Sequence, residues 1–430
     1  MAKKRKIEKR PREYTRRQLS HFKKQQRRQR FILFGGISII AAVILIILVG
    51  WLTGEYIPLH KTVIQVYDTK FNTAYYIDML EIFGKSQTSY SLAQIASTVS
   101  NQIIQMELAK QDAARLGITV SDDEAKELLE SSGIPSNDAG MDLARAQLLP
   151  DKLKSGHFDS LVPKSDNQVY LKAIMVESDS VAKIVRDRIA NSDNFTMLAE
   201  EYGQGYFTKD YKGDFGLHPI GIFLSRQIPA VVVDYAFSAE VTAGTLSQPL
   251  SDNSSYKQLG YWLIKVSDRP AEGSANVTAL LTSSEDEAKA VRVKLEAGGD
   301  VAALADQYSQ YTAAKDAHGE LGIRVSSDNV SNAFNGYVFD TSIELGKWSN
   351  PIRDDIMWTQ GGVWLVLVAD KQENSTLTDE DRQTLINEAY GTWSSDLWIV
   401  ASTDIINEMS DELKAWAIER AAKKIAEPSG

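Results

Sequence analysis

Hydrophobic positions between residues 166 and 270 alternate between strand-like runs and helix-like spacing. Residues 169–176 form an apolar run suited to a β-strand, and residues 181–202 carry apolar side chains three and four positions apart, as an amphipathic helix does. A glycine-bracketed loop, a short helix, a Gly-x-x-Ser-x-Pro turn and a β-rich strand follow, ending at residues 216, 237, 249 and 266. This order predicts a compact α+β domain.

The same pattern recurs about a hundred residues further along the chain. Four positions of the helix, Phe195, Leu198, Ala199 and Tyr202, correspond to Val301, Leu304, Ala305 and Tyr308, 106 residues later. The glycine loop at 213–216 corresponds to 319–322 at the same offset. The turn at 244–249 and the strand at 260–266 return 102 residues later, at 346–351 and 362–368. Four matches in one order with a single gap indicate that residues 166–270 and 274–371 are two copies of one domain.

Both copies resemble the parvulin-type (PpiC-like) peptidyl-prolyl isomerase domain. That family's pattern is a His-Ile-Leu first strand, a helix ending Phe-x-x-Leu-Ala-x-x-Tyr-Ser, a Gly-Gly-Asp-Leu-Gly loop, an Ala-Phe, a Gly-x-x-Ser-x-Pro turn and a closing Gly-Tyr-His-Ile-Ile strand. The likeness covers nearly all of both repeats. It implies two tandem parvulin-like α+β domains, each with an apolar pocket for a prolyl peptide.

The departures from the family pattern fall on the residues that carry its chemistry. The first-strand histidine is replaced by Ala173 and Ala279, the last-strand histidine by Trp262 and Trp364, and the Asp or Cys position by Gly205 and Tyr311. The two apolar positions that line the proline pocket hold Ile228 and Val232 in one copy, and Val330 and Phe334 in the other. We therefore expect no conventional catalytic residue. The candidates for peptide binding are Ile228, Val232, Trp262, Val330, Phe334 and Trp364.

These replacements bear directly on isomerase activity. The barrier to rotation about a prolyl bond is roughly 18–20 kcal/mol, and an enzyme lowers it with polar groups placed around a desolvated imide. Alanine and tryptophan cannot shuttle protons as imidazole does. The two tryptophans are either core aromatics of the closing strand or the lining of an apolar peptide groove.

The amino terminus carries a separate signal. Residues 1–30 hold 14 Lys and Arg against two Glu, and residues 31–52 contain no charge. At 1.5 Å per residue, 22 residues span roughly 33 Å, enough for the hydrocarbon core of a bilayer. The positive-inside bias predicts a single-pass, uncleaved signal anchor in the cell membrane, with the basic tail in the cytoplasm and the bulk of the chain on the extracytoplasmic side.

Charge and composition narrow the function further. The tail carries 14 basic and two acidic residues, a charge of +12, so the total of −10 leaves −22 for the remaining 400 residues. An acidic ectodomain argues against nucleic acid as a partner. The absence of cysteine excludes disulfides and thiol chemistry. Five scattered histidines lack metal-ligand spacing, so we expect no metal and no small-molecule cofactor; His218 and His318 flank the two glycine loops.

Helical segments flank the repeats. In residues 53–165, a stripe over 92–116 and a capping-box signal at Ser121 and Glu124 predict two helices, and residues 101–129 resemble the chaperone module of SurA-like and PrsA-like proteins. Residues 376–430 form an amphipathic segment, which we expect to be a carboxy-terminal helix. By the same resemblance this helix packs on the 53–165 module. The alternative is a free arm for clients or the membrane surface.

These signals together indicate a membrane-anchored extracytoplasmic chaperone or foldase that binds unfolded or newly translocated polypeptides, with degenerate isomerase chemistry. One alternative is an active peptidyl-prolyl cis-trans isomerase whose pocket uses substitute residues. Another is a structural spacer that holds a partner at the translocation machinery.

Overall fold

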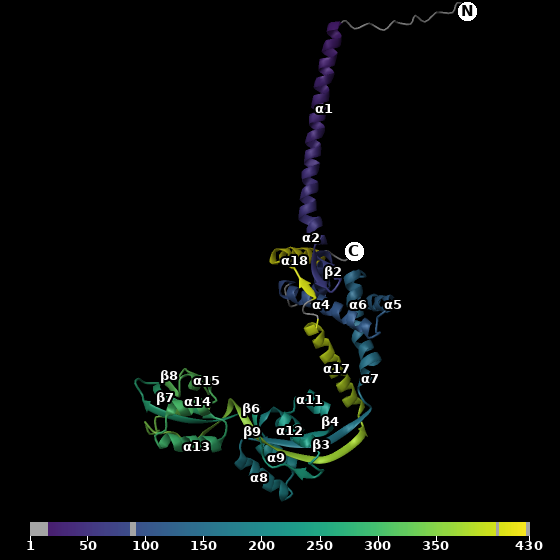
Figure 1. The fold of residues 1–430 in the computed structure, drawn as a ribbon. Coiled ribbons are helices and arrows are strands. Elements are labelled where there is room, and N and C mark those ends of the chain that lie inside the picture. Colours follow the sequence, from purple (N-terminus) through teal and green to yellow (C-terminus); the bar gives the residue numbers. More distant parts are fainter. Residues whose placement is uncertain (1–15, 87–91, 401–403, 427–430) are drawn as a thin grey trace, which may run out of the picture. The chain divides into compact units, whose positions relative to one another are not determined.

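The computed structural model describes residues 16–86, 92–400 and 404–426, with side chains from residue 33 onward. The chain divides into two compact units, one formed by Met1–His157 with Tyr390–Gly430 and the other by Phe158–Ala389 (Figure 1). The first half of the expected basic tail, residues 1–15, lies outside the described residues.

A long apolar helix begins the described part of the chain. It comprises α1 (Arg16–Trp51), a π-helical turn η1 (Leu52–Tyr56) and α2 (Ile57–His60). Leu33–His60 is the one stretch of the described residues that is long and apolar enough to cross a membrane, and its 18-residue apolar window is not buried in the protein. The expected membrane segment, 31–52, lies in this helix.

The remainder of the first unit is a helical module with a small sheet. Its helices are α3 (Thr73–Ser86), α4 (Leu92–Arg115), α5 (Asp122–Ser132), α6 (Asp138–Leu153) and α18 (Asp411–Ala426). Its strands β1 (Thr62–Val66), β2 (Thr69–Asn72) and β10 (Ile405–Asn407) form a sheet in the order β10-β1-β2. The predicted capping box is present, because Ser121 and Glu124 each bond the other's backbone N–H at the start of α5.

The carboxy-terminal segment differs from the single helix expected over 376–430. It forms α17 (Asp379–Val400), the strand β10 and then α18. β10 pairs with β1, with Ile64 opposite Asn407. Ala417 and Ala421 of α18 are buried in the core of the helical module. The edge of β1 has backbone groups that need hydrogen-bond partners, and an extended segment can supply them. The spacing of apolar residues in the sequence does not reveal this need, so it did not predict β10.

The second unit is built on an antiparallel sheet. Its strands are β3 (Ser165–Val176), β4 (Asp214–Pro219), β5 (Thr245–Leu246), β6 (Leu250–Asp268), β7 (Ser274–Thr282), β8 (Glu320–Val325) and β9 (Ile352–Thr376). The order is β4-β3-β9-β6-β7-β8, with β5 paired to β9. β6 and β9 are 19 and 25 residues long, and they pair with one another near the middle of the sheet.

Helices follow the first strand of each repeat. In the first repeat they are α8 (Asp179–Ala190), α9 (Phe195–Tyr202), α10 (Gly205–Tyr211), α11 (Ile220–Ser225) and α12 (Ala230–Phe237). In the second they are α13 (Glu285–Glu296), α14 (Val301–Tyr308), α15 (Thr312–Asp316) and α16 (Asn332–Val338). Ser178 and Ser284, 106 residues apart, cap α8 and α13 through the same side-chain bond. The short segments η2 (Lys154–Phe158) and α7 (Asp159–Leu161) lead into β3.

The two repeats exchange their closing strands. The first strand of the first repeat pairs with the closing strand of the second, with Ala173 opposite Val366. Conversely, Ala279 of the second repeat lies opposite Ile264 of the first. Each Gly-x-x-Ser-x-Pro turn contacts the closing strand of the other repeat. The Ser247 hydroxyl accepts a hydrogen bond from the Val366 N–H, and the Ser349 hydroxyl accepts one from the Ile264 N–H, each at 2.9 Å.

This exchange corrects the expected domain boundaries. The structure has a first lobe, built from residues 165–252 and 362–376, and a second lobe, built from residues 259–354. Between them β6 and β9 form a two-stranded ribbon, residues 253–258 and 355–361. Residues 166–270 and 274–371 therefore do not each close their own sheet. The two closing strands have the same pattern, and the short link 269–273 holds β6 beside β7.

Candidate functional site

The first lobe contains a hollow of about 320 Å³ at its junction with the ribbon. Trp364 and Met175 line it from β9 and β3, together with four further aromatic side chains: Tyr206 and Phe207 from α10, Tyr256 from β6 and Trp358 from β9. None of the residues that line this hollow is charged. A neutral, aromatic hollow of this kind suits an apolar group that has left water.

A buried aspartate fixes the indole ring of Trp364. The indole N–H donates to Asp252 at 2.9 Å, and the hydroxyls of Ser254 and Ser255 donate to the same carboxylate at 2.6 and 2.5 Å. Burial acts to raise the pKa of Asp252, but the hydrogen bonds from Ser254, Ser255 and Trp364 outweigh it and lower the pKa to about 2. The polar groups nearest the tryptophan are therefore already committed to one another.

The second lobe repeats this anchor. The indole N–H of Trp262 donates to Asp354 at 2.8 Å, and the Ser331 hydroxyl also donates to Asp354. Asp252 and Asp354 are 102 residues apart, like the two tryptophans. Each tryptophan therefore bonds to the aspartate of the other repeat. Sequence reasoning missed both aspartates, although their common offset with the tryptophans was a signal that could have found them.

The two lobes differ in what faces the tryptophan. Trp262 meets the ring of Tyr311 edge-on at 5.2 Å and that of Phe334 at 4.8 Å. The first lobe has Gly205 and Val232 at these two positions. Gly205 has a φ of +74°, and a Cβ there would lie 2.7 Å from the Met175 methyl group. The first lobe therefore borders its hollow at Gly205, where the second lobe has the ring of Tyr311.

The structure brings together the positions that the resemblance marked. Ala173, Ile228, Val232 and Trp364 share one buried cluster of the first lobe, and Gly205 and Trp364 line the hollow. Ala279, Trp262 and Phe334 share the matching cluster of the second lobe, with Tyr311 and Val330 packed against it. The description of the tryptophans as core aromatics fits both rings, because they are fully buried, but Trp364 also lines the hollow.

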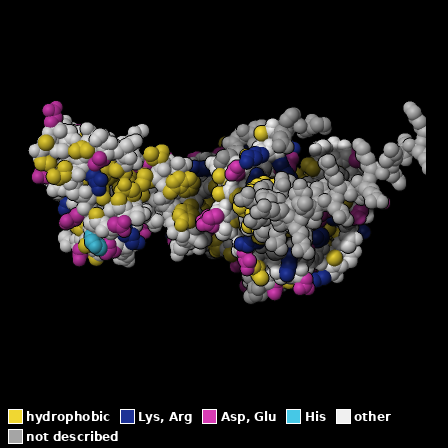
Figure 2. Space-filling model, turned by 90° about the horizontal axis from the view of Figure 1, so that it is seen from above, with side chains coloured by type: hydrophobic (Ala, Val, Ile, Leu, Met, Phe, Trp, Pro, Cys, Tyr) yellow, Lys and Arg dark blue, Asp and Glu magenta, His cyan; other side chains and the backbone are white. Residues whose placement is uncertain are grey.

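Three exposed aromatic residues at the hollow were absent from the sequence prediction. Tyr206, Tyr256 and Trp358 are 65%, 61% and 57% exposed. Tyr256 and Trp358 are 102 residues apart, so they are equivalent residues of the two repeats that the ribbon brings to one hollow. Figure 2 shows hydrophobic side chains gathered over the narrow part of the second unit, where β6 and β9 run. Only the strand exchange places them together, which is why the repeat pattern did not reveal them.

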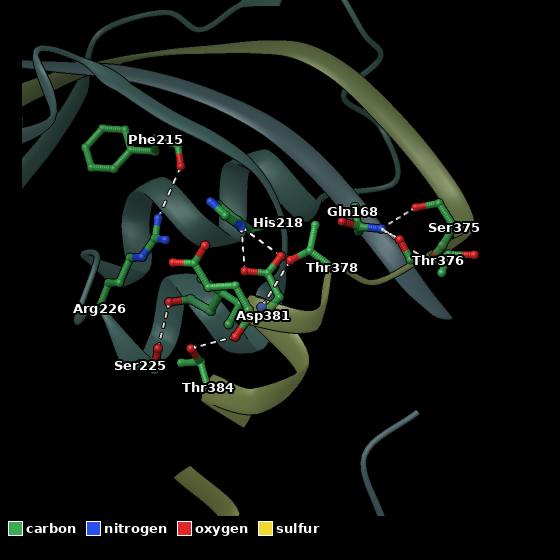
Figure 3. A network of polar contacts seen from close by, with 12 residues as sticks. Gln168, Phe215, His218, Ser225, Arg226, Ser375, Thr376, Thr378, Asp381 and Thr384 are labelled. Atoms are coloured by element: carbon green, nitrogen blue, oxygen red, sulfur yellow. Dashed lines mark hydrogen bonds and ion pairs between the residues drawn. The ribbon is translucent and has the colours of Figure 1, made fainter. Parts of the chain in front are cut away.

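His218 serves a structural contact in the same unit. Its ring is directed at Asp381 of α17, with Nδ1 2.8 and 2.9 Å from the two carboxylate oxygens (Figure 3). Asp381 is buried and belongs to the acidic first turn of α17, whose N-terminus Thr378 caps. His318 lies in the second repeat beside Asp306, at 2.9 Å. The described residues contain no group of three His, Cys, Asp or Glu side chains that could hold a metal ion.

Comparison with known proteins identifies a class for the amino-terminal region. Residues 25–160 match the family model of the SurA-like N-terminal domain. This match confirms the resemblance to SurA-like and PrsA-like foldases that the motifs of the module indicated.

Particular relatives carry the name foldase protein PrsA. The protein of that name from Exiguobacterium sibiricum is 32% identical over 132 residues, which cover 29% of this chain and 41% of the relative. That from Caldanaerobacter subterraneus is 26% identical over 184 residues, which cover 40% of this chain and 56% of the relative. The chain thus spans about half the length of these curated relatives.

A solved structure, the peptidylprolyl isomerase PrsA from Bacillus anthracis, matches 76% of this chain and 98% of its own at 10% identity. The TM-score of 0.27 is too low to inform the fold.

Proposed function

We propose that this protein is a membrane-anchored extracytoplasmic chaperone of the foldase type, and that it binds unfolded or newly translocated polypeptides in the hollow of the first lobe. The observation that carries the proposal is the hollow itself, an uncharged cavity lined by exposed aromatic side chains. Exposed aromatic rings beside a cavity mark a binding surface in an otherwise acidic, soluble ectodomain. The SurA-like domain and the PrsA relatives support the same class.

Binding at this site does not require isomerase chemistry. The family's histidine positions hold Ala173 and Trp364, and its Asp or Cys position holds Gly205. The indole N–H of Trp364 and the hydroxyls of Ser254 and Ser255 donate to Asp252, so they are engaged rather than aimed at a bound imide. With no free donor from these groups, the lobe acts as a peptide holder with little effect on the prolyl barrier.

The second lobe has a structural role in this proposal. Tyr311 and Phe334 pack edge-on against Trp262, which is fully buried. Strand β9, which belongs to the second repeat, supplies Trp358 to the hollow of the first lobe. In this proposal the second repeat completes the binding site of the first. The alternative of a structural spacer then applies to the second lobe alone.

The membrane anchor is the helix that contains Leu33–His60. In this proposal the basic tail stays in the cytoplasm, and the chain that follows the anchor helix lies outside, where newly translocated chains emerge. A contact with the translocation machinery remains part of the proposal and rests on this location alone.

The test combines two assays on the full chain in detergent. We expect it to slow the aggregation of an unfolded client without proline, and to leave prolyl cis-trans exchange in a model peptide unchanged. Trp358→Ala should weaken the protection several-fold, because it removes an exposed ring of the hollow. The matched control is Val293→Ala, which removes an apolar side chain 66% exposed on α13, away from the hollow.

Two results would decide against the proposal. Robust acceleration of prolyl exchange, lost on mutation of the hollow, would establish the enzyme instead. If the wild type and the Trp358→Ala variant protected the client equally, the hollow would have no part in client binding.

A further inference from the structure

The ribbon that joins the two lobes has two different faces. Lys257 is paired with Thr359 across the ribbon, and Tyr256 and Trp358 belong to the cross-strand pairs on either side. Because side chains alternate along a strand, Tyr256 and Trp358 lie on one face and Lys257 and Thr359 on the other. The first face carries exposed rings of the hollow, whereas Lys257 and Thr359 are fully buried. A movement of the ribbon would therefore move the rim of the hollow.

Lys257 is a buried lysine that the proposed binding site does not use. Its amine donates a hydrogen bond to the Gly361 carbonyl across the ribbon, and it forms no ion pair with a carboxylate in the described part of the chain. Burial lowers the pKa of Lys257 to about 8, although the carboxylates of Glu177 and Glu287 act in the opposite direction. At neutral pH the amine is charged, and its burial costs free energy.

This lysine lies at the junction of the two lobes. Glu177 directly follows β3 of the first lobe, and Glu287 belongs to the first turn of α13 in the second. The charge of Lys257 thus interacts with one carboxylate from each lobe. Separation of the lobes at this junction would admit water to the amine and restore its hydration.

Hydrogen bonds around Glu177 hold the same junction closed. The Tyr261 hydroxyl of the second lobe donates to Glu177 at 2.9 Å, and Arg353 donates to the Tyr261 hydroxyl at 3.2 Å. The backbone N–H of Glu285 also donates to Glu177. Burial raises the pKa of Glu177, while the bond from Tyr261 and the charge of Arg353 oppose that shift.

A second set of hydrogen bonds joins the starts of two helices. The hydroxyls of Ser178 and Ser180, at the start of α8, donate to Asp286 in the first turn of α13. Burial acts to raise the pKa of Asp286, but these bonds and the charge of Lys289 outweigh it. The junction therefore combines hydrogen bonds that close it with a buried lysine charge that opposes closure.

We propose that this junction is a hinge poised to open, and that its opening moves Tyr256 and Trp358 away from the hollow and releases a bound client. The hydrogen bonds favour the closed arrangement, and the buried charge of Lys257 limits its stability. The bound ligand rests on the proposed function, but the motion of the lobes can be measured without a client. The hinge gives the ribbon a role in release as well as in binding.

The first test measures the distance between the lobes in the full chain in detergent. Because the sequence contains no cysteine, Met197→Cys on α9 and Val293→Cys on α13 provide one spin-label site in each lobe. Both side chains are well exposed, at 67% and 66%. Pulsed electron paramagnetic resonance then gives the distribution of distances. We expect a closed and an open population when no further residue is changed.

Two substitutions should move this distribution in opposite directions. Lys257→Met removes the buried charge and keeps a side chain of similar length, so it should favour the closed population. Tyr261→Phe removes the bonds to Glu177 and Arg353, so it should enlarge the open population. The control is Lys183→Met, which makes the same chemical change at an exposed position of α8.

The second test follows the release of a labelled unfolded client after excess unlabelled client is added. Release should be several-fold slower from the Lys257→Met variant and several-fold faster from the Tyr261→Phe variant. The Lys183→Met variant should release the client at the wild-type rate. Failure of the hinge is distinguishable from failure of the proposed function, because Trp358→Ala tests the hollow and the distance measurement uses no client.

Three results would overturn the proposal. One is an unchanged distance distribution in both the Lys257→Met and Tyr261→Phe variants, and another is a shift of both in the same direction. The third is an unchanged release rate in variants whose lobe distances do shift. Should Lys257→Met disturb the fold, an unchanged distribution in the Tyr261→Phe variant would overturn the hinge by itself.

Discussion

The two lobes of the second unit have the same fold and the same tryptophan anchor, but they differ in what lies beside the tryptophan. In the first lobe, Gly205 and Trp364 line an aromatic hollow, whereas in the second Tyr311 and Phe334 pack on Trp262. The polar anchor is retained where the hollow is not: each tryptophan bonds to an aspartate. Gly205, at a position where the second repeat has the ring of Tyr311, distinguishes a lobe with a hollow from one with aromatic packing.

The largest expected effect comes from comparing two fragments of the second unit, one bounded by the sequence repeat and one by the observed lobe. Residues 166–270 lack the closing strand that completes their sheet, so this fragment should remain unfolded. Residues 257–356 contain every strand of the second lobe and should fold alone. Circular dichroism and cooperative melting of both fragments provide the measurement. A cooperatively folded 166–270 fragment would show that the repeat can close on itself.

Truncation of the two tryptophans should give similar losses of stability but different losses of function. Trp262→Ala and Trp364→Ala each remove a buried ring and one of the hydrogen-bond donors to an aspartate, so each should cost about 3–5 kcal/mol in the free energy of unfolding. Binding of an unfolded client should fall only in the Trp364 variant, compared at a temperature where both remain folded. Equal loss of binding in the two variants would contradict the assignment of the site to the first lobe.

A smaller effect concerns the acid sensitivity of the first lobe's anchor. The folded-state pKa of Asp252, about 2, lies below its ordinary value of 3.8, so the carboxylate stabilises the fold above about pH 4 and this stability is lost as the pH falls through 2. The difference corresponds to about 2 kcal/mol. Asp252→Asn should therefore be less stable than the wild type at pH 7, and the gap should narrow between pH 4 and pH 2. Chemical denaturation across this pH range would reveal a constant gap if the carboxylate charge were unimportant.

The sequence predicted the local elements well and their pairing poorly. Periodicity located β3, but the one helix predicted over 181–202 is two helices, α8 and α9; the 106- and 102-residue offsets identified both repeats. The resemblance grouped Ala173 and Gly205 with Trp262 of the same repeat, whereas the structure places Trp364 of the second repeat beside them. The choice of partner for each closing strand was beyond reach, because residues 260–266 and 362–368 have the same pattern of residues.

The aromatic rim of the hollow shows the consequence of that limit. Tyr256 and Trp358 belong to different repeats and lie together only because β6 pairs with β9. The carboxy-terminal strand β10 was missed for a related reason, since its pairing with β1 joins residues more than 300 positions apart. Local spacing carries no record of such contacts, which tertiary packing decides.

The most direct test of the central claim compares equivalent positions of the two lobes by photo-crosslinking. A photoreactive amino acid replaces Tyr206, which lines the hollow, or Thr312, the exposed residue 106 positions later in the second repeat. The full chain is then illuminated with an unfolded client. The account predicts strong crosslinking from position 206 and little from position 312. Equal crosslinking from the two positions, or more from position 312, would contradict it.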